Sequence, residues 1–64
     1  MNTELKAKII QKFGRQFVFG RACGIREDRI SRFIYGRATP TPEEKAIIAK
    51  MLQVQESEIF PEAS

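Results

Sequence analysis

The chain has 64 residues and a net charge of +3, with one cysteine and no histidine. A chain of this length forms one small domain and cannot enclose a large interior pocket, so we expect no small-molecule ligand. The single cysteine excludes an intramolecular disulfide. Without histidine, a Cys/His zinc site and the usual acid–base arrangements are also excluded. The sequence therefore gives no reason to assign a catalytic residue, a metal or a cofactor.

The chain contains no apolar run that approaches the length of a membrane span. Its first eight residues also lack the apolar region of a signal peptide. These features predict a cytoplasmic protein of a bacterial cell, without membrane contact.

Charge is divided unevenly along the chain. Residues 1–40 hold nine Lys and Arg against three acids, a charge of +6, and residues 41–64 hold two Lys against five Glu, a charge of −3. This division predicts a polyanionic partner on one side of the molecule. The alternative is a solvated surface with a chance imbalance.

The first predicted helix begins after Asn2 or Thr3, which are both good N-cap residues, and ends at Gly14. Apolar residues recur along one of its faces at helical spacing, and we expect this face to be core. The apolar residues are Leu5, Ile9, Phe13 and, widening the stripe, Ile10.

The central stretch 16–35 reads as two short helices, 16–23 and 27–35, joined at Gly24. Glycine ends a helix in a left-handed conformation at little steric cost, and Ile25 after it is an apolar plug under the turn.

On the first of these helices, Phe19 and Cys23 share a face on which Gly20 has no side chain. Another helix could therefore cross closely at Gly20. Cys23 is expected to be a buried structural residue rather than a nucleophile. Phe17 and Val18 lie off this face. They are either additional core residues beneath the first helix or exposed apolar surface. Core is favoured because most large apolar side chains are buried.

The helix at 27–35 has an apolar back and a polar front. Ile30, Phe33 and Ile34 are spaced i, i+3, i+4 and face inward. The residues predicted on the front and flanks are Glu27, Asp28, Arg29, Ser31, Arg32 and Tyr35.

Both helices of the stretch begin poorly by local rules. Arg15 and Arg26 occupy N-cap positions where Ser, Thr, Asp or Asn is preferred, at a loss of roughly 1 kcal/mol each. A cation also opposes the positive end of the helix dipole. A DNA phosphate near each helix start would resolve the conflict. Alternatively, Gly14 caps the first of the two, while Glu27 and Asp28 offset Arg26.

The pattern of this stretch resembles the helix-turn-helix of the phage Cro and repressor (lambda repressor-like) family. The matching residues are Gln16, Gly20, Cys23, Gly24, Ile25, Ile30, Ser31 and Phe33, and a weaker match extends from about Leu5 to Phe60. The resemblance implies an all-α, compact five-helix bundle with 1–64 as a single domain. It also implies a sequence-specific transcriptional regulator of phage or prophage type, associated with the nucleoid, which places its third helix in the major groove of an operator.

The resemblance also implies which residues contact double-stranded DNA. A Gln at the position of Gln16 bonds a phosphate in that family, although it could also be a plain first-turn residue. Arg32 is the best base reader because a guanidinium can hold guanine O6 and N7 together. It could also pair with Asp28 at i, i+4. The loop after the third helix follows the DNA backbone in that family. The candidate DNA-binding residues are Arg15, Gln16, Arg26, Glu27, Asp28, Arg29, Ser31, Arg32, Tyr35 and Arg37.

Glu27 and Asp28 depart from the family, which often has neutral amides or hydroxyls at these positions. Carboxylates repel phosphates, yet they can accept a hydrogen bond from cytosine N4.

The last third of the chain predicts two more helices. Thr41, Pro42 and Glu44 form a strong helix start with a capping box. A short fifth helix over 55–60 is stopped by Pro61, and the residues that follow are expected to fray. The residues expected to face inward are Ile47, Ile48, Met51, Leu52, Ile59 and Phe60.

One recognition helix reads few base pairs, so we expect a weak two-fold homodimer on two half-sites. Val54, Ile59 and Phe60 could supply its contact, unless the monomer's own core uses all three. The competing function is a protein-interaction role on the same fold, as in an antitoxin-like partner that neutralises another protein.

Overall fold

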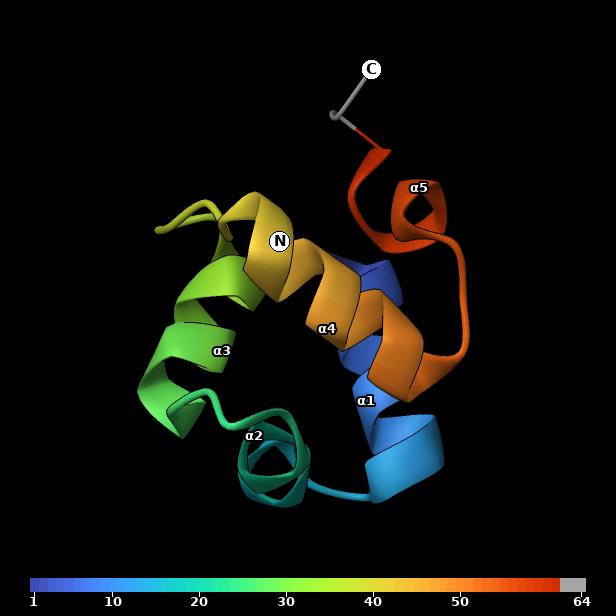
Figure 1. Ribbon diagram of the computed structural model, residues 1–64. Coiled ribbons are helices and arrows are strands. Elements are labelled where there is room, and N and C mark those ends of the chain that lie inside the picture. Colours follow the sequence, from blue (N-terminus) through green and yellow to red (C-terminus); the bar gives the residue numbers. More distant parts are fainter. Residues whose placement is uncertain (62–64) are drawn as a thin grey trace.

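Five α-helices follow one another in the computed structural model, which describes residues 1–61, and those residues include no strand (Figure 1). α4 crosses over α1. The pair α2 and α3 lies to one side of these two helices, and α5 packs against α1 and α4. The expected fraying concerns residues 62–64, which lie outside the described ones. The all-helical, compact architecture is confirmed. The helices are α1 (Thr3–Phe13), α2 (Gln16–Cys23), α3 (Glu27–Tyr35), α4 (Pro42–Leu52) and α5 (Glu56–Ile59).

The predicted boundaries of α1 and the predicted start of α4 are confirmed by their caps. The side chain of Asn2 accepts a hydrogen bond from the Leu5 backbone N–H at 3.0 Å, and α1 ends at Gly14. Thr41 and Glu44 form the capping box reciprocally, with distances of 3.1 Å and 2.8 Å.

The core forms one cluster to which all five helices contribute, and it includes the predicted inward face of α3. Phe13 lies at its edge, half-buried, with its ring 5.0 Å from that of Phe19 in an edge-to-face arrangement. The buried apolar residues are Leu5, Ile9, Phe19, Ile30, Phe33, Ile34, Ile48, Ala49, Leu52, Ile59 and Phe60.

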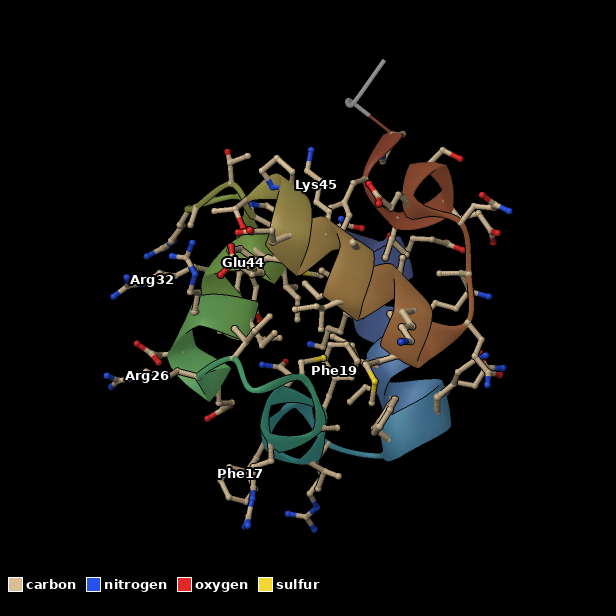
Figure 2. The ribbon with its side chains drawn as sticks, viewed as in Figure 1. Phe17, Phe19, Arg26, Arg32, Glu44 and Lys45 are labelled. Carbon is tan, nitrogen blue, oxygen red and sulfur yellow. The ribbon has the colours of Figure 1, made fainter. Side chains whose placement is uncertain are left out.

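Four residues expected in the core are exposed instead, which corrects the predictions for Ile10, Phe17, Val18 and Ile47. Each helix of this small bundle buries only one face, and these residues lie beside that face rather than on it. Phe17 is 55% exposed and points out from α2, whereas Phe19 on the same helix points into the interior (Figure 2). On α4 the inward place beside Ile48 belongs to Ala49, which is buried.

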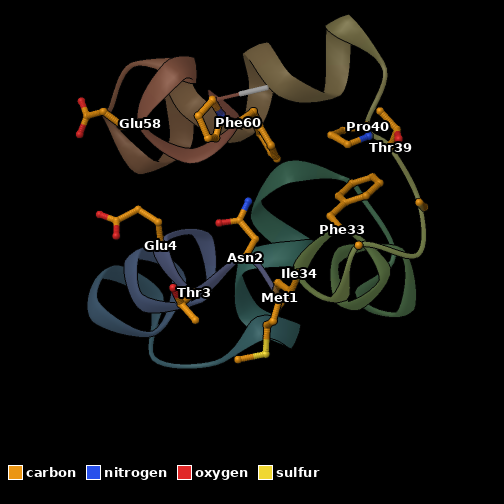
Figure 3. Close-up of a pocket in the computed structure, with 13 residues that line it drawn as sticks. Met1, Asn2, Thr3, Glu4, Phe33, Ile34, Thr39, Pro40, Glu58 and Phe60 are labelled. Carbon is orange, nitrogen blue, oxygen red and sulfur yellow. The ribbon is translucent and has the colours of Figure 1, made fainter. Parts of the chain in front are cut away.

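Asn2 joins three parts of the chain that are distant in sequence. Its side-chain Nδ2 donates to the Ile59 carbonyl at 2.6 Å, and its backbone N–H donates to the Ile34 carbonyl at 2.5 Å. The cap on Leu5 is its third bond. These bonds hold the start of α1 against the ends of α3 and α5, at a hollow whose lining includes Phe33 and Phe60 (Figure 3).

A bidentate ion pair between Arg29 and Glu44 fastens α3 to the start of α4. Nε of Arg29 donates to Oε2 of Glu44 at 2.6 Å, and Nη2 donates to Oε1 at 2.9 Å. The Arg29 guanidinium, helped by the hydrogen bonds from Thr41, lowers the pKa of Glu44 to about 2. The pair raises the pKa of Arg29 from its already high ordinary value.

This pair predicts an acid-sensitive contribution to stability. The folded-state pKa of Glu44 lies below its ordinary value of 4.5, so the stabilisation is complete above about pH 4.5 and is lost as pH falls towards 2. Glu44→Gln should lower the free energy of unfolding by about 1 kcal/mol at pH 7 and by progressively less below pH 4.5. Urea unfolding between pH 7 and pH 2 measures this difference.

The matched control is Glu43→Gln, which removes the same charge from the same turn. Glu43 makes no ion pair or side-chain hydrogen bond within residues 1–61. If the two variants gave the same pH profile, net charge rather than the Arg29–Glu44 pair would control the acid response.

Candidate functional site

The α2–α3 turn is built on a close backbone approach at Gly20. The Ile25 N–H donates to the Gly20 carbonyl at 3.0 Å, and Gly24 takes the predicted left-handed conformation with φ of 73°. A Cβ placed on Gly20 would lie only 2.7 Å from the Ile25 carbonyl oxygen. The glycine was expected to admit a crossing helix, but it is the backbone of the turn that approaches it. The turn is therefore tight, and it fixes where α3 begins.

The outward face of α3 and the loop after it form one open hollow. Ile30, Phe33 and Ile34 are buried on the opposite face, as predicted. In Figure 2, Arg32 extends from α3 away from the interior. The residues that line the hollow are six of the ten candidates, namely Glu27, Asp28, Ser31, Arg32, Tyr35 and Arg37.

A second hollow continues this surface around the start of α3 and onto α2. The two hollows share Glu27 and Asp28. Phe17 contributes an exposed ring, and the guanidinium of Arg21 lies over it, 5.6 Å from the ring centroid. Sequence reasoning did not include Phe17 and Arg21 in the site. Their i, i+4 spacing together with the basic side chain was the available signal.

The two helix starts differ in how their cations are compensated. Neither Arg15 nor Arg26 makes a side-chain cap bond. Nε of Arg26 lies 3.3 Å from Oδ1 of Asp28 and both side chains are exposed, so a carboxylate offsets this cation as the alternative explanation proposed. The alternative in which Gly14 caps α2 is wrong, because Arg15 is the N-cap residue of this helix. The first turn of α2 also holds no acidic side chain that could offset Arg15. The start of α2 is therefore without local compensation.

The basic candidates fall into two groups by their contacts. The predicted alternative for Arg32, a pair with Asp28, is absent because Asp28 lies against Arg26. Within the described part of the chain, Arg32 and Arg37 make no ion pair. Arg29, by contrast, is held by Glu44 and lies 5.0 Å from the centroid of the Phe33 ring. Its guanidinium serves packing, which its position in the sequence did not reveal because Glu44 is 15 residues away.

Gln16, Ser31 and Tyr35 are the remaining candidates, and all three are at least partly exposed. Gln16 is half-buried at the start of α2, with no side-chain hydrogen bond to another residue of 1–61, and Ser31 is half-buried on α3. Tyr35 is exposed.

Cys23 packs half-buried against the core rather than in an open site. Burial of the thiol raises its pKa from 9.0 to about 11, so the reactive thiolate is scarce at neutral pH. No group of three or more Cys, Asp or Glu side chains among residues 1–61 is placed to hold a metal ion.

No protein-family model matches the sequence, and no curated protein or solved structure shows significant similarity to the chain. Within residues 1–61, every helix is too short or too polar to span a bilayer.

Cys23 supplies a test of how α2 is oriented. Because burial raises the pKa of Cys23 to about 11, the folded chain should react with a thiol reagent at pH 7 at least tenfold more slowly than the urea-unfolded chain. Cys23→Ala should lower the free energy of unfolding by about 1 kcal/mol through lost packing. Equal labelling rates in the two states would show that α2 presents Cys23 to solvent.

Proposed function

We propose that α2 and α3 form a helix-turn-helix unit through which the chain binds double-stranded DNA and regulates transcription at an operator. The observation that supports this proposal most directly is the outward face of α3. There Arg32 and Arg37 line one open hollow and have no ion-pair partner in the described chain. A short helix with a buried apolar back fits the major groove, and a free guanidinium at its front can hold guanine O6 and N7.

The start of α2 supports a phosphate contact. Arg15 caps this helix without a side-chain bond, and Gln16 follows it at the first helical position. The free backbone N–H groups and the positive end of the helix dipole favour an anion there. A DNA phosphate would supply the negative charge that the first turn of α2 lacks.

Arg29 takes a different part in this proposal from the one its charge suggests. Because Glu44 occupies Nε and Nη2, the side chain fixes α3 against α4 rather than reaching for a phosphate. We therefore place Arg29 among the residues that hold the reading helix in position.

Two copies on two half-sites remain the proposed working unit, since one helix reads too few base pairs to select a site in a genome. Ile59 and Phe60 are buried in the monomer's own core and Val54 is half-buried against it. Burial therefore supports the alternative given above, in which the monomer's own core uses these three residues. Ile59 and Phe60 are therefore not free to form a contact between copies.

The second candidate function is a protein-interaction role, and the exposure of Phe17 and Val18 favours it. Exposed apolar side chains on one helix can contact a partner protein. The salt dependence of binding to duplex separates the two functions. Binding that weakens steeply as salt rises indicates contacts to DNA phosphates, because such contacts release condensed counterions.

The proposed function predicts salt-dependent binding to duplex of random sequence. If about four phosphates are contacted, log K should fall with log salt at a slope of about −3 to −4. Fluorescence anisotropy of a labelled duplex from 50 mM to 200 mM salt measures the slope. Absence of binding at low salt, or a flat response, would remove DNA as the partner.

Reading and positioning should separate in two arginine variants. Arg32→Ala should weaken binding to a selected operator by about 1–3 kcal/mol and affect random duplex much less. Arg37→Ala serves as the matched comparison, since it lies beyond the end of α3 and should weaken both duplexes alike. An unchanged ratio of operator to random affinity in Arg32→Ala would show that α3 does not read through this side chain.

A further inference from the structure

The two hollows that meet at the start of α3 place carboxylates at the centre of a basic surface. Arg21 and Arg26 line one hollow and Arg32 and Arg37 line the other, while Glu27 and Asp28 belong to both. Four cations against two acids leave a net charge of +2 over the joined surface. A polyanion is therefore attracted to the rim, and the carboxylates face whatever part of it reaches the centre.

The two carboxylates are not equivalent. Asp28 is paired with Arg26 at 3.3 Å. Glu27 is exposed, and in the part of the chain that the structure describes its carboxylate makes no ion pair or hydrogen bond. Its backbone is well placed, because the Glu27 N and Cα lie only 3.5 and 3.6 Å from where a Cβ on Gly20 would sit. Glu27 is thus a free acceptor at the first position of α3, on backbone that packs tightly against α2.

We propose that Glu27 accepts a hydrogen bond from the N4 amino group of a cytosine, so that each half-site carries a C·G pair at a fixed position. This assignment rests on the proposed function and specifies what that site reads. Guanine presents two acceptors in the major groove and repels a carboxylate, thymine presents an acceptor and a methyl group, and adenine sets its N7 acceptor beside its amino donor. Cytosine presents the donor alone.

A purely structural role for Glu27, in which it only stabilises the start of α3, predicts a different result. An acid in the first turn stabilises the helix dipole by a small amount, and its removal would weaken α3 without altering which sequence is preferred. The test therefore has to measure sequence preference and not affinity alone.

The experiment is selection from a library of random duplexes with the wild-type chain, Glu27→Gln and Glu43→Gln, followed by sequencing. Glu43→Gln is the matched control, since it makes the same change in the first turn of α4, outside both hollows. The wild type and Glu43→Gln should enrich half-sites with the same cytosine. Glu27→Gln should lose that preference and favour adenine at the position, because an amide can hold adenine N6 and N7 together.

Direct titration completes the test. Replacing the selected C·G pair by T·A should weaken wild-type binding about tenfold and leave Glu27→Gln nearly unaffected. Thermal melting of each variant, followed by circular dichroism, checks that α3 is intact. A wild-type consensus that Glu27→Gln leaves unchanged would overturn the assignment while the proposed function stood. If the wild-type chain bound no duplex, or bound duplex without any preference, the assignment would fall together with the sequence-specific function.

Discussion

The contact between Gly20 and the Ile25 carbonyl oxygen is the constraint on which the candidate site depends. A single added carbon at residue 20 would lie 2.7 Å from that oxygen, which is closer than packed atoms tolerate. The backbone bond from the Ile25 N–H to the Gly20 carbonyl closes the same turn at 3.0 Å. With this turn fixed, α3 leaves α2 in one direction only, and Ile30, Phe33 and Ile34 bury its back. The polar front then faces outward as a consequence of packing.

The Arg29–Glu44 pair holds the other side of α3, and it does so with a carboxylate that already has a local task. Oε1 of Glu44 accepts from the Thr41 backbone N–H in the capping box and from Nη2 of Arg29, while Oε2 accepts from Nε. One side chain therefore ends the connector, starts α4 and anchors α3. An exposed ion pair contributes little, but the Glu44 side chain is only 18% exposed and the pair is bidentate, which strengthens it. Protonation of Glu44 would loosen the helix start and the anchor together.

Local rules predicted the parts of this fold that depend on neighbouring residues. The left-handed turn at Gly24 and the capping box of Thr41 follow from a few adjacent side chains, and the structure confirms both. The exposure of Phe17 and the engagement of Arg29 were not predictable in this way. Whether Phe17 is covered depends on which face of α2 packs against the rest of the bundle, and the partner of Arg29 comes from the start of another helix. Hydrophobicity and charge identify such residues without identifying what they contact.

The burial of Ile59 and Phe60 in the monomer's core also shapes how the proposed interface would work. Ile59 and Phe60 complete the monomer, and Asn2 binds the Ile59 carbonyl to the start of α1. The last helix is therefore part of the fold rather than an arm left free for a second copy. With the apolar residues of α5 buried, two copies meeting on DNA would gain most of their free energy from the duplex. Under that proposal, selectivity has to come from the few polar side chains at the front of α3, and a free acceptor such as Glu27 matters there as much as the arginines around it.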